Sequence, residues 1–292
     1  MTVREALRDG TTRLSAAGAE TPYLDATVLL AYCMGTTKEH LFAELLSAVE
    51  PAVLGNFRDA LARRERGVPV SYIRRTKEFY GRVFYVDERV LVPRPDTETA
   101  VEAALEIIDR RKRAPATPAD AGPAAPPLRV LDCCTGSGAI ALTLAAERPD
   151  LEVAGSDVSG GAGEVFTLNS RRILGRELPF YGSDLLAAVP GTWDLIVSNP
   201  PYLRSEEVAE MRAREWPEPP EALDGGADGL DTVRRLAEEA LYSLKPCAYL
   251  VIEASDDQNM SVRSILQTAG YGRIETRQDL AGRRRVVIGR RE

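Results

Sequence analysis

The sequence is poor in histidine and cysteine, and this excludes several kinds of active site. His40 is the only histidine among 292 residues, so a histidine-rich metal site cannot form and a Ser-His-Asp triad would have to be built on this one residue. The four cysteines, Cys33, Cys133, Cys134 and Cys247, show no C-x-x-C spacing, and we interpret them as small buried hydrophobic residues. We therefore expect no bound metal.

Long apolar runs and an excess of basic residues are also missing. No stretch approaches the roughly 18 consecutive apolar residues of a membrane helix, and the N-terminal MTVREALRDG lacks the apolar core of an export signal. A cytosolic protein without a membrane partner is expected. The net charge is −7 and the isoelectric point about 5.1. Because proteins that neutralise many phosphates are usually basic, direct DNA binding is not expected.

The chain divides into regions of different pattern, namely residues 1–77, 78–127 and 128–292. In the first region apolar residues recur at helical spacing, as at Ala26, Leu29, Leu30 and Cys33. This spacing predicts a small N-terminal helical domain.

The second region begins with a change of period that predicts a β-hairpin as a connector over residues 78–92. There β-branched and aromatic residues flank the turn formers Asp87-Glu88. A helix over about Thr97–Arg113 follows, with its first residue or Asp96 as the cap. The proline- and alanine-rich residues 114–127 cannot pack a core, so they predict an extended, mobile linker.

The third region alternates apolar strands with helices, which predicts a parallel, doubly wound α/β sheet with helices on both faces. The expected strands lie near 128–132, 151–156, 180–181, 194–198, 248–253, 272–276 and 285–288, and the expected helices near 139–147, 163–174, 231–244 and 260–269. The last two strands are joined by QDLAG, which is too short for a crossover helix. We therefore expect an antiparallel C-terminal hairpin at the sheet edge, with one reversed edge strand. This is typical of the Rossmann-like fold of class I methyltransferases.

A glycine-rich turn follows the first of these strands and precedes a helix; it reads Asp132-Cys133-Cys134-Thr135-Gly136-Ser137-Gly138. Glycines here let the backbone approach a ligand, and the helix start supplies free N–H donors. The dinucleotide spacing Gly-x-Gly-x-x-Gly is not met, because residue 141 is alanine. Asp132 would repel a pyrophosphate but can accept from an ammonium group, such as the amino-acid end of S-adenosylmethionine. Taken alone, the segment could equally be an ordinary turn.

Polar residues also end the next three strands. Asp157 can accept from both hydroxyls of a ribose, Asp184 can accept from an adenine amino group, and Leu185 can pack on the ring. Asn199 ends the fourth strand. Ligands of open α/β sheets bind at the carboxyl ends of the strands. Four successive strand ends aimed at one crevice therefore favour a site for S-adenosylmethionine over four independent caps.

The tetrapeptide Asn199-Pro200-Pro201-Tyr202 comes directly after the fourth strand. Two prolines stop the strand and restrict the backbone on both sides. The Pro200 carbonyl and the Asn199 side-chain carbonyl then form two fixed acceptors for an –NH2 group, and Tyr202 offers a flat face for a planar group. Hydrogen bonds of this kind aim the nitrogen lone pair without a strong base. The pattern predicts methylation of an amide or aromatic amine nitrogen.

Longer segments of the chain carry a family resemblance: Gly67–Glu98 with its PRPDTE, VLDCCTGSGAIAL, SNPPYL, EPPEALDGGADGL and RQDLAGRRRVVIGR. Together they are similar to the protein-(glutamine-N5) methyltransferases of peptide-chain release factors, the HemK/PrmC family. The resemblance covers nearly the whole chain. The hairpin block and GGADGL are more specific than NPPY, which amino-methyltransferases of DNA and RNA share.

This resemblance implies that Cys134–Gly138, Asp157, Leu185 and Asn199 contact S-adenosylmethionine. It also implies that Asn199–Tyr202 bind the glutamine amide in the Gly-Gly-Gln loop of a class 1 release factor, which the helical domain docks. The chain departs from the family at Asp96, where glutamate is usual, and at Glu253-Ala254-Ser255, where Glu-Ile-Gly is usual. These departures lie outside the tetrapeptide.

Three other functions remain open from the residues. Methylation of a glutamine on a ribosomal protein would use the same chemistry. Adenine-N6 methylation of nucleic acid would share the tetrapeptide, although the acidic balance argues against it. A binding module that has lost catalysis would be expected to lack a strand-end ligand or Asn199, and both are present.

Overall fold

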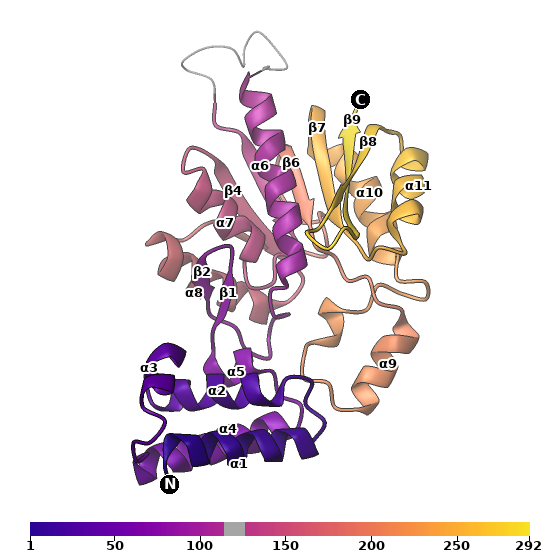
Figure 1. Ribbon diagram of the computed structural model, residues 1–292. Helices are drawn as coiled ribbons and strands as arrows, with labels where there is room; N and C mark the ends of the chain where they lie inside the picture. The colour runs from indigo at the N-terminus through magenta and orange to yellow at the C-terminus, as the bar shows by residue number, and fades with distance from the viewer. Residues whose placement is uncertain (114–125) are drawn as a thin grey trace. The chain divides into compact units, whose positions relative to one another are not determined.

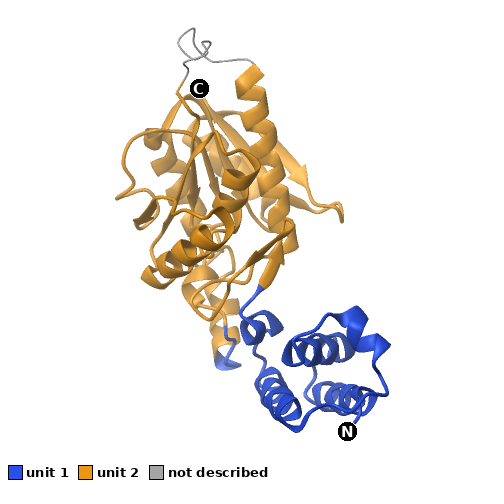
Figure 2. Ribbon diagram, turned by 90° about the vertical axis from the view of Figure 1, so that its left-hand side faces the viewer, with its two compact units in different colours: residues 1–76, 213–217 blue, residues 77–212, 218–292 orange. Residues whose placement is uncertain are grey.

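The computed structural model describes residues 1–113 and 126–292 (Figure 1). The predicted linker falls almost entirely on residues 114–125, which lie outside the described residues. The chain forms two compact units, drawn in different colours in Figure 2: Met1–Thr76 with Ala213–Pro217, and Lys77–Arg212 with Glu218–Glu292. Grouped by contacts, the hairpin and the helix of the second predicted region are part of the larger unit and do not form a separate region.

The smaller unit is helical, as the apolar spacing predicts. Its helices are α1 (Val3–Ala16), α2 (Pro22–Cys33), α3 (Lys38–Ala43), α4 (Pro51–Glu65) and α5 (Val70–Arg74). Leu29, Leu30, Phe57 and Leu61 are buried in one apolar core. The start of α1 is fixed by a capping box, in which Thr2 accepts from the N–H of Glu5 and the Glu5 carboxylate accepts in return.

A β-hairpin follows, but it is shorter than predicted. Strands β1 (Lys77–Phe79) and β2 (Arg82–Phe84) pair antiparallel. The turn is Tyr80-Gly81, with φ of 47° and 69° at the two residues, a left-handed pair that suits a tight hairpin. A turn does form at the predicted place, since the Val90 N–H donates to the Asp87 carbonyl at 3.1 Å. It closes no hairpin, however, because residues 90–92 form no strand. The left-handed pair Tyr80-Gly81 matches the twist of the two strands, but only the glycine is a residue type that predicts this conformation.

The next helix also begins differently from the prediction. A short 3-10 turn, η1 (Pro95–Thr97), leads into α6 (Glu98–Arg113). Arg94, which precedes the 3-10 turn, makes no side-chain capping hydrogen bond, and the carboxylate of Asp96 pairs with Arg285 at 2.6 Å. The Thr97 hydroxyl instead accepts a hydrogen bond from Asn199, 3.2 Å away. This contact turns Thr97 toward the strand ends.

The larger unit is built on a seven-stranded sheet in the order β5-β4-β3-β6-β7-β9-β8. The strands are β3 (Arg129–Cys133), β4 (Glu152–Asp157), β5 (Phe180–Gly182), β6 (Trp193–Ser198), β7 (Leu244–Glu253), β8 (Tyr271–Gln278) and β9 (Arg284–Arg291). The class I methyltransferase fold and the antiparallel C-terminal hairpin are confirmed. The reversed strand, β9, lies between β7 and β8 rather than at the edge itself.

Helices cover both faces of this sheet. The helices that alternate with its strands are α7 (Ala139–Glu147), α8 (Gly160–Leu174), α10 (Asp231–Ser243) and α11 (Asn259–Ala269). α6 packs on α7 and α7 on α8, whereas α10 packs on α11. Two further elements, α9 (Ser205–Ala213) and η3 (Pro220–Ala222), were not predicted.

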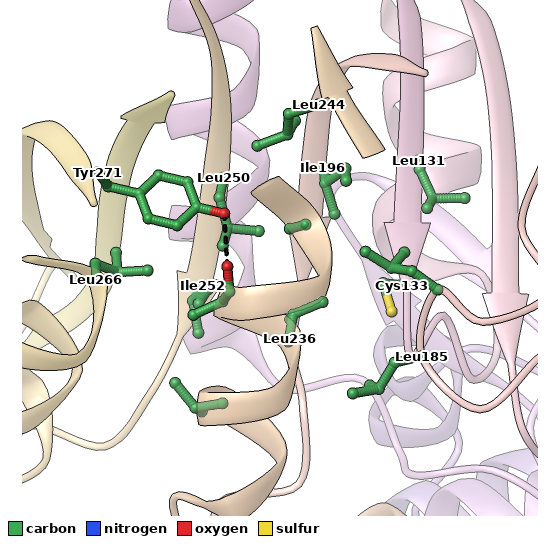
Figure 3. Packing of buried hydrophobic residues seen from close by; sticks show 14 of the residues in the cluster. Leu131, Cys133, Leu185, Ile196, Leu236, Leu244, Leu250, Ile252, Leu266 and Tyr271 are labelled. Carbon is green, nitrogen blue, oxygen red and sulfur yellow. Dashed lines mark hydrogen bonds between the residues drawn. The ribbon is translucent and has the colours of Figure 1, made fainter. Parts of the chain in front are cut away.

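Buried apolar side chains from the strands and from the helices packed on them form a hydrophobic core, of which Figure 3 shows a part. Every residue of β6 is buried, as expected of a central parallel strand. The Tyr271 hydroxyl donates to the Ala237 carbonyl at 3.0 Å, so this buried phenol keeps a partner. Each buried leucine side chain contributes about 1.5–3 kcal/mol. This rigid core holds the carboxyl ends of β4, β3, β6 and β7 along one edge.

Candidate active site

The glycine-rich turn after β3 is shaped for close approach of a ligand to the backbone. Cys134, Gly136 and Gly138 have φ of 60°, 52° and 83°. A Cβ on Gly138 would lie 2.9 Å from side-chain atoms of Leu142 and Phe166, so no larger residue fits there. Gly138 caps α7 directly. Ala139 and Ile140, the first residues of α7, line the pocket, and their N–H groups have no partner among the described residues.

Asp132 stabilises this turn through hydrogen bonds. It is fully buried, and its Oδ2 accepts from the Thr135 hydroxyl at 2.6 Å and from the Ala141 N–H at 3.0 Å. Both donors come from the turn and the helix it starts, so Asp132 shapes the turn. It does not line the pocket, and its Oδ1 is buried without a partner; the direct contact with an ammonium group stays a prediction. Burial raises the pKa of Asp132 to about 7.

Asp157 ends β4 and does face the pocket. Its Oδ2 accepts from the Gly136 N–H at 2.9 Å, and its Oδ1 accepts from the Ser159 N–H at 3.0 Å. Burial raises the pKa of Asp157, against the opposing effect of these backbone hydrogen bonds. Asp157 thus ties the glycine-rich turn to the start of α8, and a carboxylate has further lone pairs for a ligand hydroxyl.

Asp184 and Leu185 lie on the pocket wall beyond β5. Leu185 is buried with φ of 48°, an unusual conformation for a large residue. Asp184 is exposed and pairs with Arg235 at 2.9 Å. The sequence did not indicate this arginine, which also lines the pocket. The wall therefore offers an apolar surface for a flat ring beside a neutralised carboxylate.

The pocket measures about 190 Å³ and gathers most of the predicted site residues. Those that line it are Cys134, Thr135, Gly136, Ser137, Asp157, Asp184, Leu185, Asn199 and Pro201. Those that do not are Asp132, Gly138, Pro200 and Tyr202. Lining residues missed by the sequence reasoning include Arg94, Thr97, Ile140 and Glu221. Three of these fall in the PRPDTE and EPPEAL segments, which carried the resemblance but no chemical pattern of their own.

The tetrapeptide has the two free acceptors that its sequence predicts. The Asn199 Nδ2 donates to Thr97 Oγ1, and no donor reaches Asn199 Oδ1 from residues 1–113 or 126–292. The Pro200 carbonyl likewise receives no hydrogen bond from any described residue. Burial raises the pKa of the Tyr202 phenol, so it stays neutral. Two carbonyl oxygens on a restricted backbone are thus left for a ligand.

The backbone after the tetrapeptide is held by the segment Gly225–Leu230. The Gly225 N–H donates to the Leu203 carbonyl at 2.8 Å, and the Gln258 side chain donates to the Tyr202 carbonyl at 2.8 Å. A Cβ on Gly225 would lie 2.7 Å from the Pro201 carbonyl oxygen. The close approach explains why this segment is glycine-rich, and it locks the tetrapeptide in place.

Replacing Gly229 by alanine is expected to damage the site. Gly229 has φ of 76°, and a Cβ there would lie 2.3 Å from the Tyr202 carbonyl oxygen. Backbone strain costs about 1–3 kcal/mol, and the clash displaces the tetrapeptide, so turnover should fall at least about tenfold. Gly270→Ala is the matched control, because Gly270 has φ of 103° with nothing within 4 Å. Equal turnover in the two variants would show that the contact does not matter.

A second element of the site is held by a buried glutamate that the sequence reasoning missed. The Glu218 side chain is only 1% exposed and pairs with Arg94 at 2.6 Å. Its other oxygen accepts from the Val92 N–H at 3.0 Å. A buried carboxylate with both a cation and an N–H partner is well compensated. Glu218 thereby fixes the segment before η1 along the pocket.

The raised pKa of Asp132 predicts a specific pH dependence of stability. The folded chain keeps this proton up to pH about 7, whereas an unfolded aspartate loses it near pH 4. The free energy of unfolding should therefore fall as pH rises through this window, by up to about 1.4 kcal/mol per pH unit, and level off above it. Urea unfolding of wild type and Asp132→Asn at several pH values measures the effect. Identical slopes for the two proteins would contradict it.

No group of three or more histidine, cysteine, aspartate or glutamate residues in the described part of the chain is arranged to hold a metal ion. Among the same residues, no helix is both long and apolar enough to cross a membrane.

The fold matches solved methyltransferases. The methyltransferase of Pyrococcus furiosus is similar with a TM-score of 0.51 and 16% identity, over 79% of this chain and 98% of that one. The T. thermophilus 16S rRNA N2 G1207 methyltransferase, solved with AdoMet and guanosine, has a TM-score of 0.52 and 15% identity, over 74% of this chain and 50% of that one. The sheet order and the pocket at its strand ends define a class I methyltransferase, whose cofactor is S-adenosylmethionine.

Sequence comparison gives the family. The PrmC N-terminal domain profile matches residues 5–74, and the methyltransferase small domain profile matches residues 123–216. The release factor glutamine methyltransferase of Moorella thermoacetica is 37% identical over 100% of this chain and 99% of its own length. That of Cereibacter sphaeroides is 37% identical over 99% of both chains. The chain belongs to the release factor glutamine methyltransferase family.

Proposed function

We propose that this chain transfers the methyl group of S-adenosylmethionine to the side-chain amide nitrogen, N5, of the glutamine in the Gly-Gly-Gln motif of class 1 peptide-chain release factors. Relatives named release factor glutamine methyltransferase align over 99% or more of this chain. One observation carries the chemistry: Asn199 Oδ1 and the Pro200 carbonyl oxygen lie next to each other in sequence, and neither has a donor among the described residues.

The residues of the pocket fit the cofactor. The N–H groups of Ser137, Ala139 and Ile140 have no partner among the described residues and suit its carboxylate. Asp157 suits its ribose hydroxyls, and Leu185 suits its adenine ring. When bound, S-adenosylmethionine supplies a methyl group attached to a positively charged sulfur. Hydrogen bonds to Asp132 hold the glycine-rich turn in the conformation that leaves its backbone accessible to the cofactor.

The tetrapeptide solves the problem of a weak nucleophile. An amide nitrogen shares its lone pair with its carbonyl, so it attacks a methyl group poorly. Two carbonyl acceptors, at Asn199 and Pro200, can hold both hydrogens of the –NH2 group and favour a tetrahedral nitrogen. The nitrogen–methyl bond forms as the sulfur–methyl bond breaks, and the methylated nitrogen, now strongly acidic, gives up one of its two hydrogens as a proton to water. Tyr202 provides a flat face for the amide. Orientation of two reactants in this way contributes about 7–11 kcal/mol to lowering the barrier, so no strong base is needed.

We further infer that the helical unit, Met1–Thr76, docks the release factor. Its side chains Tyr23, Leu24, Tyr32 and Leu46 are between 47% and 74% exposed, and such apolar groups suit a protein partner. We expect the enzyme to act in the cytosol, where release factors work, and to bind no DNA directly. The net charge of −7 supports a protein over a nucleic acid as substrate.

A methylation assay separates the candidate substrates. The protein is incubated with labelled S-adenosylmethionine and, in parallel, a release factor, ribosomal proteins or oligonucleotides. Label should enter the release factor at its Gly-Gly-Gln glutamine, as located by mass spectrometry. A release factor with glutamate at that position is the matched control and should stay unlabelled. Label on ribosomal proteins or on nucleic acid alone would overturn the assignment.

A further inference from the structure

Glu253 lies beside the catalytic tetrapeptide but had no role in the sequence reasoning. It is the last residue of β7, which pairs with β6 in the register Ser198↔Ile252. The residues that follow this pair, Asn199 and Glu253, are therefore neighbours at the carboxyl edge of the sheet. The end of η1 brings Thr97 to the same place. Three segments far apart in the chain thus meet at the side chain of Asn199.

The contacts among these three residues are polar and buried. Asn199 Nδ2 donates to Thr97 Oγ1 at 3.2 Å. Glu253 is only 2% exposed, and its Oε2 is buried without a hydrogen-bond partner. Burial raises the pKa of Glu253 to about 7, while hydrogen bonding with Thr97, the charge of Arg285 and hydrogen bonding with Asn199 act in the opposite direction. Such a buried carboxylate attracts donors strongly.

An asparagine amide has two chemically different ends, and the mechanism uses only one. If the amide were flipped, its –NH2 would face the –NH2 of the substrate, and one of the two acceptors would be lost. An ionised carboxylate accepts hydrogen bonds but cannot donate them. The Oε2 of Glu253, which has no partner, can therefore accept the Thr97 hydroxyl hydrogen, and Thr97 Oγ1 then acts as an acceptor that selects the –NH2 end of Asn199. This leaves Asn199 Oδ1 as the end that remains free.

We propose that Glu253, acting with Thr97, is a positioning residue that fixes the Asn199 amide with its carbonyl oxygen available to the substrate nitrogen. The proposal rests on the proposed function, because only an –NH2 substrate requires this orientation. Glu253 does not line the pocket, so it acts through Asn199 rather than on the cofactor.

Glu253→Gln tests the proposal with little change of shape. Glutamine can donate as well as accept, so it no longer selects one orientation of the amide. At saturating substrates kcat should fall by about 10–100-fold, which is less than the loss of about 10²–10³-fold on direct removal of a preorganised hydrogen-bonding group, because Glu253 acts through Asn199. The dissociation constant of S-adenosylmethionine should stay within about threefold, and thermal stability should not fall. Glu147→Gln is the matched control; Glu147 pairs with Arg82 and does not line the pocket.

Thr97 gives a second test that does not alter a buried charge. Thr97→Val keeps the shape and removes the hydroxyl, so kcat should fall, and Thr97→Ser should recover the loss. If Glu253 and Thr97 act through the same hydrogen bond to Asn199, the double variant Thr97→Val with Glu253→Gln should lower kcat little more than the stronger of the two single substitutions. Fully additive losses, or undiminished kcat in Glu253→Gln and Thr97→Val, would overturn the positioning role.

The pH profile of kcat provides a readout that a purely structural role would not change. Below pH about 7 the Glu253 carboxyl gains a proton and can donate, so wild-type kcat should fall on the acid side. The charged and titratable groups around it are Asp96, Arg285 and Tyr202. Glu253→Gln should lack this acid limb, and its persistence would overturn the role. A wild-type enzyme that fails to label a release factor would instead contradict the proposed function.

Discussion

Asn199→Ala is expected to abolish detectable turnover, with kcat reduced on the order of 10³-fold. The substitution removes one of the two carbonyl acceptors and leaves the substrate –NH2 held only by the Pro200 carbonyl. Loss of one preorganised hydrogen-bonding group in an active site costs about 10²–10³-fold, and the loss of alignment adds to it. The fold should survive, because the adjacent strand β6 is buried along its whole length.

Initial rates with labelled S-adenosylmethionine and a release factor measure the effect, with circular dichroism as the check on folding. Gln267→Ala is the matched control, since it removes an exposed amide from α11. Near-normal turnover in a folded Asn199→Ala would contradict the mechanism of two acceptors.

Asp157→Ala should mainly weaken cofactor binding. The carboxylate lies on the pocket wall and holds the glycine-rich turn through the Gly136 N–H at 2.9 Å. Its removal loses a charged acceptor for the ribose and loosens the turn. Hydrogen bonds to charged groups contribute about 1.5–3 kcal/mol, which corresponds to roughly a 10–100-fold rise in the dissociation constant.

Isothermal titration of S-adenosylmethionine measures this constant directly. Asp150→Ala is the matched control, because Asp150 pairs with Lys112 at the surface of the same unit and lies outside the pocket. At saturating cofactor, kcat of Asp157→Ala should recover most of its wild-type value. An unchanged dissociation constant would show that Asp157 serves only the turn.

The sheet was predictable because its pattern is strong. Buried parallel strands read as continuous apolar runs, and the five residues QDLAG leave room only for an antiparallel connection. The hairpin turn was not, because Tyr80 takes a left-handed conformation that its residue type does not signal. β9 lies one strand in from the sheet edge because it, and not β8, pairs with β7. This contact joins segments far apart in the chain, and the sequence does not indicate which of the two strands makes it. Helix α9 was not predicted because only Val208 in it is buried, so its sequence shows no apolar periodicity.

The candidate site was predictable where function depends on the end of a strand. Asp157 ends its strand and Asn199 directly follows its strand, so the topology alone brings them to one pocket. The contacts that support the site from distant parts of the chain were not predictable: Thr97, which contacts Asn199, is 102 residues away from it, and Arg94 is 124 residues from its partner Glu218. Asp132 also follows the pattern of a strand end, but its turn and helix supply its donors from within.

The most direct measurement is a crystal structure with S-adenosylhomocysteine and a peptide that contains Gly-Gly-Gln. The glutamine –NH2 should lie within hydrogen-bond distance of both Asn199 Oδ1 and the Pro200 carbonyl oxygen, with its nitrogen facing the cofactor sulfur. A glutamine side chain bound elsewhere, with Asn199 turned into the core, would contradict the central claim that two fixed carbonyl oxygens present the amide for methylation.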